Sequence, residues 1–270
     1  MQSDKSLWLG PMRRPVWLAM VICIATTLAL AAWFILARIL NPQTAYDMQE
    51  MIRPAGKPLV QVTLLALTGA LVFGSAYLSD TKGAIESEPH GFFDILSLVL
   101  ARLAMIGVVF IVLVMFYEVV ARYVFGAPTL WANEMSLWIA SLVFLLSGQY
   151  AMQQRSHIRI YIIYDGMPRW MQKGADVISV ALIVGFTFVL VWGSFDDASA
   201  RLARMEGLGT AWNPPIPGTV KPAILFIIVL VALQAVSNLI ADWNKAPGKH
   251  SEEPDAHEIE SIRRTLEEPK

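Results

Sequence analysis

Six stretches of the 270-residue chain contain no Asp, Glu, Lys or Arg. These stretches are Pro15–Ala37, Pro58–Ser79, Leu103–Tyr117, Met135–Gln154, Val177–Phe195 and Pro222–Ala241. Five of them approach the roughly 20 residues that a helix needs to cross about 30 Å of hydrocarbon. Because lipid offers no hydrogen bonds, each crossing backbone must satisfy its own, as a helix does. The sequence therefore predicts an all-α polytopic membrane protein with six transmembrane helices.

The third stretch is the shortest, but apolar sequence continues on both sides of it. Long basic side chains can reach outward to the lipid headgroups, so Arg102 is expected to snorkel to the membrane surface. The helix is then expected to begin near Phe92 and to end near Phe125. The following turn, Gly126–Pro128, ends it because proline disfavours helical geometry in the preceding residue.

Composition argues against several classes of protein. The formal net charge is -1, so no basic surface indicates a nucleic-acid partner. The single cysteine, Cys23, predicts a small packed residue and excludes an internal disulfide. None of the four histidines lies in an apolar stretch, where a haem-bearing anchor needs its ligands. With no P-loop, HExxH or GxSxG motif, we expect no enzymatic activity, catalytic residue, cofactor or metal site.

The chain divides into three expected parts. Residues 1–90 form an N-terminal extension with two transmembrane helices and a polar, acidic linker at 80–91, which is expected to be flexible. Residues 91–243 form a four-helix core, and residues 244–270 form a charged, flexible tail. The first apolar stretch exceeds the roughly 7–15-residue core of a signal peptide, which favours a retained helix over a cleaved one.

Orientation is predicted from Lys and Arg near the helix ends, because these residues favour the cytoplasmic side. The strongest basic clusters are Arg13–Arg14 and Arg155–Lys173. Successive transmembrane helices cross in opposite directions, so a cluster before the first helix and a cluster after the fourth lie on the same side of the membrane. We therefore expect both termini in the cytoplasm.

Ionisable residues close to membrane depth are the usual functional candidates. Glu118 and Arg122 are spaced i, i+4 and can pair on one helix face. They can form a local salt bridge, or they can hold a partner subunit or a lipid phosphate, and the sequence favours neither. Four polar side chains in the apolar stretches can also hydrogen-bond between helices, each bond worth about 1 kcal/mol. They are Gln61, Gln149, Gln234 and Asn238.

A transporter's substrate site usually lies between helices that glycine or proline interrupts. The stretches here contain scattered glycines and no internal proline. This chain alone is therefore not expected to carry a substrate pathway, and no substrate-binding residue is predicted.

Residues Phe92–Trp243 resemble the small permease (DctQ-type) subunit of tripartite ATP-independent periplasmic (TRAP) transporters. The resemblance rests on Ala121–Trp138 and Gly148–Ile160, with a proline-rich turn at Trp212–Pro217. Tyr161 departs from the family pattern, which commonly has an aspartate there, and the first 90 residues add two helices to the usual four. The matching residues are Arg122, Tyr123, Trp131, Glu134, Arg155, His157 and Ile158.

The resemblance implies a non-catalytic subunit in the bacterial inner (plasma) membrane. Such a subunit scaffolds a large, elevator-type permease subunit and helps to dock a periplasmic substrate-binding protein during organic acid uptake. Its partners would be those two proteins and membrane lipids. The candidate interface residues are Glu118, Arg122, Trp131, Glu134, Arg155 and His157.

Two other classes of function remain open at this point. The chain could be a stand-alone membrane sensor or anchor that uses its acidic tail as a signalling arm. It could also be the membrane anchor subunit of a redox enzyme. Copurification of a large permease subunit would favour the transporter, and copurification of haem or quinone would favour the redox anchor.

Overall fold

The computed structural model describes residues 6–41, 46–81, 83, 86, 89, 91–154, 164 and 166–244. Six helices in these residues are long and apolar enough to cross a membrane, which confirms the predicted all-α fold with six transmembrane helices. The helices are η1 (Gly10–Met12), α1 (Arg13–Leu40), α2 (Met48–Met51), α3 (Pro58–Ser79), α4 (Phe92–Tyr123), α5 (Ala132–Gln153), α7 (Arg169–Ala203) and α8 (Ile216–Asp242).

Two helices are longer than the sequence predicted. Helix α7 extends beyond both ends of the uncharged stretch Val177–Phe195, and it reaches Ala203 because no glycine or proline lies between Phe195 and Ala203. Helix α8 begins at Ile216, with Pro217 in its first turn. Proline is tolerated there because N–H groups of the first turn have no acceptor within the helix, so its missing N–H costs no hydrogen bond. Pro222 therefore lies inside α8, and the expectation of no internal proline is wrong.

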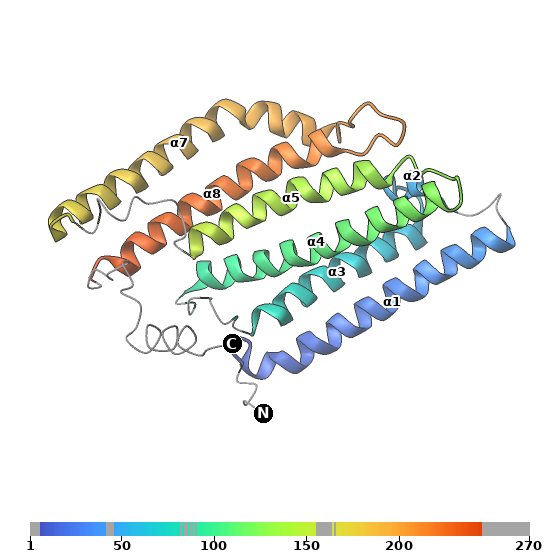
Figure 1. Cartoon of the computed structure of the whole chain (residues 1–270), viewed down its shortest axis with the longest axis horizontal. Coiled ribbons are helices and arrows are strands. Elements are labelled where there is room, and N and C mark those ends of the chain that lie inside the picture. The colour runs from blue at the N-terminus through green and yellow to red at the C-terminus, as the bar shows by residue number, and fades with distance from the viewer. Residues whose placement is uncertain are drawn as a thin grey trace, which may run out of the picture.

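The long helices lie side by side in one layer, in the order α1, α3, α4, α5, α8 and α7 (Figure 1). Neighbouring helices run antiparallel, except that α5 and α8 run in the same direction. The helices end at two opposite sides of the layer. The side at which α1 begins is called the N-side, and the opposite side is called the far side. Helix α8 ends on the N-side, like α3 and α5 (Figure 1).

A single layer has two broad faces, and each long helix presents large apolar side chains outside the protein. In a bilayer these side chains meet lipid tails, so their exposure carries no penalty. One example from each helix, all more than half exposed, is Leu28, Leu65, Phe116, Phe144, Trp192 and Phe226.

Neighbouring helices approach closely where one of them carries glycine. A Cβ on Gly69 of α3 would lie 2.8 Å from Sγ of Cys23 in α1. A Cβ on Gly107 of α4 would lie 2.8 Å from Cγ2 of Val143 in α5. Lipid supplies no hydrophobic force between helices, so this close packing contributes directly to their association. Cys23 is accordingly a half-buried packing residue.

Polar side chains supply the second kind of contact between the core helices. Nε2 of Gln149 donates to Oγ of Ser97 (2.8 Å), whose hydroxyl donates to Oε1 of Gln234 (3.2 Å). Nδ2 of Asn238 donates to the carbonyl of Met152 (2.8 Å). These bonds join α4, α5 and α8, and they confirm the hydrogen bonds between helices expected of Gln149, Gln234 and Asn238.

Candidate interface residues at the two edges of the layer

Glu118 joins the end of α4 to the start of α5 on the far side. Its side chain is only 5% exposed, and its carboxylate accepts hydrogen bonds from Nε of Arg122 (2.9 Å) and from the N–H and hydroxyl of Thr129 (3.0 Å to the N–H). The Thr129 hydroxyl in turn accepts from the N–H of Ala132, the first residue of α5 (3.3 Å). Glu118 thus holds the α4–α5 turn together from inside.

Arg122 differs from its partner in exposure. Its side chain is 50% exposed, although Nε and Nη2 both bond to Glu118. A guanidinium group has five N–H donors, so this ion pair leaves others for a second acceptor. Of the i, i+4 pair, Arg122 is therefore the residue whose polar groups an outside molecule can reach.

Trp131 and Glu134 lie at the start of α5, Trp131 at its N-cap and Glu134 in its first turn. The Trp131 ring stacks on Tyr117 of α4, with ring centroids 5.8 Å apart. Glu134 accepts a hydrogen bond from the hydroxyl of Thr210 (2.7 Å), which lies in the turn between α7 and α8. Both residues thus make contacts within the chain on the far side.

Trp212 connects α2 to the turn between α7 and α8. The residue is only 2% exposed, and its indole N–H donates to the carbonyl of Met48 in α2 (2.9 Å). A contact across 164 residues leaves no local signal in the sequence, so sequence analysis did not detect it. It brings the short helix α2 against the turn that follows α7.

Arg102 of α4 makes a second such connection, on the N-side, to residues that follow α3. Its Nη2 donates to Oε2 of Glu86 (2.6 Å) and to the carbonyl of Thr81 (3.2 Å). Tyr150 of α5 donates its hydroxyl to Oε1 of the same carboxylate (3.1 Å). The guanidinium that was expected to reach the headgroups is bound in the structure by Glu86 and Thr81.

Glu86 is buried in this cluster, with only 7% of the residue exposed. Burial alone would raise its pKa, but the hydrogen bonds from Arg102 and Gly83, with the charge of Arg102, bring the pKa below its ordinary value. The carboxylate is thus charged and holds the linker against α4 and α5. The sequence did contain a signal for this contact. An arginine nearly three turns inside an apolar helix needs an anion, and the linker supplies nearby carboxylates.

The segment before η1 folds back onto the end of α3. Oδ1 of Asp80 accepts hydrogen bonds from the hydroxyl of Ser6 and the N–H groups of Trp8 and Leu9, each 2.9 Å long. Nε of Arg13 lies 3.4 Å from Oδ2, an ion pair without a hydrogen bond. Asp80 is completely buried, so this carboxylate fixes the start of α1 to the end of α3.

Replacing Asp80 with asparagine is expected to lower the melting temperature at neutral pH, through a loss of about 1–3 kcal/mol. Burial would raise the pKa of Asp80, but the N–H groups of Leu9 and Trp8 and the Ser6 hydroxyl hold it below 3.8, its ordinary value. A lowered pKa contributes stability that is complete above the unfolded-state value and is lost as pH falls through the folded-state value.

The difference in melting temperature between wild type and Asp80→Asn should therefore be constant above about pH 5 and shrink below about pH 4. Thermal melts in detergent at both ends of this range measure it. Asp196→Asn, a change at an exposed carboxylate, is the control and should show no such difference. A difference for Asp80→Asn that stays constant down to pH 3 would contradict the assignment.

Arg155 and His157, two of the predicted interface residues, lie outside the described residues, so their role stays a prediction. Among the residues that the structure describes, no cluster of His, Cys, Asp or Glu could hold a metal ion. The four described candidates, Glu118, Arg122, Trp131 and Glu134, come together at the far-side ends of α4 and α5.

The chain is similar in sequence to proteins of known families. A family model described as "Tripartite ATP-independent periplasmic transporters, DctQ component" matches residues 111–245. The sialic acid TRAP transporter permease protein SiaT of Haemophilus influenzae (strain 86-028NP) is 23% identical over 166 residues, which are 52% of this chain and 27% of that protein. The C4-dicarboxylate TRAP transporter small permease protein DctQ of Vibrio cholerae serotype O1 is 25% identical over 84 residues, 31% of this chain and 36% of that protein. No solved structure matches the chain.

The chain covers only 27% and 36% of the lengths of these two relatives. The family match takes in half of the residues of this chain, from within α4 to just past the end of α8. It contains the α4–α5 turn and the α7–α8 turn, with the described family-like residues Arg122, Trp131 and Glu134. The chain therefore belongs to the DctQ component family of the tripartite ATP-independent periplasmic transporters.

Proposed function

We propose that this chain is the small membrane subunit of a tripartite secondary transporter for organic acid uptake. It scaffolds a large, elevator-type permease subunit and contributes to docking a periplasmic substrate-binding protein. The substrate class is inferred from relatives that are named for sialic acid and C4-dicarboxylate transport.

The observation that carries this proposal is the single helical layer. A polar solute crosses a membrane through a path that protein surrounds, and one layer of helices cannot surround it. The buried polar groups of the core, around Gln149 and Gln234, bond to each other between α4, α5 and α8. The sequence analysis took the lack of internal proline as a sign that this chain carries no substrate path. Because Pro222 lies inside α8, that sign is lost, and the proposal rests on the single layer. A layer with two broad apolar faces is suited to extend a larger membrane protein sideways.

We further propose that the chain has three parts with different roles. Residues 1–90 form an accessory pair of helices beside a four-helix core at 91–243, and 244–270 form a cytoplasmic tail. Two contacts support a fixed attachment of the pair: Glu86 with Arg102 on the N-side, and Met48 with Trp212 on the far side. We also propose that the N-side faces the cytoplasm, as the basic residues Arg13 and Arg14 suggest.

The α4–α5 hairpin is proposed as the element that contacts the large subunit. Arg122 offers exposed N–H donors at its far-side end, and His157 follows its N-side end in the sequence. Arg122→Ala and His157→Ala are each expected to reduce the large subunit recovered in affinity purification by about fivefold or more, as for a central interface residue. Uptake in cells should fall with recovery.

Arg204→Ala is the matched control, because Arg204 is also an exposed far-side arginine but lies at the end of α7. Melting temperatures of the purified chain distinguish a lost interface from a damaged α4–α5 turn, since Arg122→Ala also removes a partner of Glu118. If both variants insert normally, copurify at wild-type stoichiometry and leave uptake unchanged, the interface role is wrong.

A further inference from the structure

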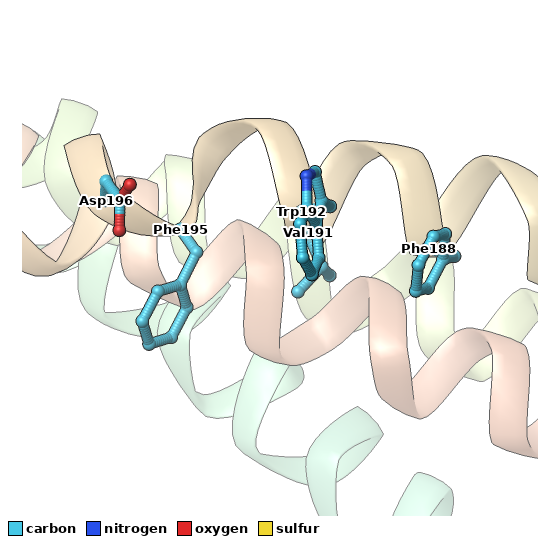
Figure 2. A pocket seen from close by; sticks show the side chains of 5 residues that line it. All are labelled: Phe188, Val191, Trp192, Phe195 and Asp196. Atoms are coloured by element: carbon cyan, nitrogen blue, oxygen red, sulfur yellow. The ribbon is translucent and has the colours of Figure 1, made fainter.

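Helix α7 carries an open hollow that none of the contacts described above uses (Figure 2). The helix lies at the edge of the layer, where α8 is its neighbour (Figure 1). The rings of Phe188 and Trp192 stack with centroids 6.0 Å apart, and Trp192 is 80% exposed. Residues that line the hollow are Phe188, Val191, Trp192, Phe195 and Asp196.

The aromatic side chains form a row along the helix axis. Phe188, Trp192 and Phe195 are spaced i, i+4 and i+7, so they share one side of α7. In a membrane this row runs from the hydrocarbon towards the far-side surface. A lipid acyl chain has the same direction and can lie along it.

Asp196 stands at the far-side end of this row and is the first charged residue after the apolar stretch 177–195. It is exposed, and within the described part of the chain its carboxylate has no hydrogen bond or ion pair. The neighbouring Asp197 is different, because it bonds to Nε of Arg201 (2.9 Å) and to Nζ of Lys221 (2.7 Å). An unneutralised carboxylate thus lies where the hydrocarbon ends and the headgroups begin.

The chemistry of this site favours a cation attached to an acyl chain. A carboxylate attracts an ammonium group, and aromatic rings attract it as well, through their negatively charged faces. An anionic headgroup without an ammonium would be repelled by Asp196. We propose that the hollow binds a phospholipid with an ammonium headgroup in the far-side leaflet, with the headgroup at Asp196 and an acyl chain along Trp192 and Phe188.

Native mass spectrometry of the full chain tests this proposal, with phosphatidylethanolamine and phosphatidylglycerol of identical acyl chains supplied in equal amounts. Wild type is expected to retain phosphatidylethanolamine in preference, by about threefold or more. Asp196→Asn should bring the ratio close to one, and Trp192→Leu should lower the occupancy of phosphatidylethanolamine.

Two matched controls make the result specific. Asp197→Asn removes the same charge from the adjacent, paired carboxylate, and Phe186→Leu removes an exposed ring from the opposite side of α7. Both should bind lipid like wild type. The proposal is overturned if wild type shows no preference, if Asp197→Asn acts like Asp196→Asn, or if Asp196→Asn reduces recovery of the large subunit while lipid binding is unchanged. The last outcome would mean that a protein covers this face.

Discussion

Replacing Arg102 with methionine is expected to lower the melting temperature of the purified chain by about 5 °C or more. Methionine keeps the apolar stem in α4 but leaves the buried carboxylate of Glu86 without its cation. Removing one member of a buried ion pair typically costs about 3–5 kcal/mol, because the remaining charge is left in a medium that solvates it poorly. The linker should then detach from α4 and α5, and limited proteolysis should cleave it faster.

A second substitution identifies the cause. Glu86→Gln removes the unpaired charge, so the double variant Arg102→Met/Glu86→Gln should regain part of the lost stability. If Arg102 acted by binding lipid headgroups, Glu86→Gln would bring no recovery. Arg14→Met, at an exposed arginine on the same side of the layer, controls for the loss of a positive charge and should melt like wild type.

Gly218→Ala is expected to destabilise the far side through a clash of backbone atoms. A Cβ at this position would lie 2.7 Å from the N of Glu206 and 3.0 Å from the carbonyl carbon of Met205. Backbone atoms cannot rotate away as a side chain can, so the turn between α7 and α8 must move. Overpacking of this kind costs about 1–3 kcal/mol. The same turn carries Trp212 and Thr210, so its contacts with α2 and α5 should weaken as well.

Thermal melts compare this variant with Gly185→Ala, a glycine inside α7 where a Cβ would meet nothing within 4 Å. The control should be neutral or slightly stabilising, because alanine favours helix over glycine by roughly 1 kcal/mol. Equal melting temperatures for Gly218→Ala and Gly185→Ala would contradict the close approach. A wild-type melting temperature for Gly218→Ala would do the same.

The candidate site illustrates which parts of a membrane protein can be predicted locally. The pairing of Glu118 with Arg122 follows from helical spacing, and the structure has it. The burial of that carboxylate by Thr129, which leaves Arg122 as the exposed member, depends on how the α4–α5 turn closes. Similarly, the depth of Arg102 indicated that it needed an anion or the headgroups, but only the tertiary structure selects Glu86.

The sequence by itself determined the six membrane-spanning helices, because crossing the hydrocarbon requires long uncharged stretches whose backbone bonds are all internal. It also determined most helix ends, through proline, glycine and charged residues at the boundaries. The order of the helices in the layer was decided only by the tertiary structure. Lipid tails are as apolar as leucine, so a side chain that faces lipid and one that faces another helix look the same in the sequence. The pairings that set this order depend on a few close glycines and buried polar contacts, such as Gly107 with Val143 and Gln149 with Ser97, and their partners lie far apart along the chain.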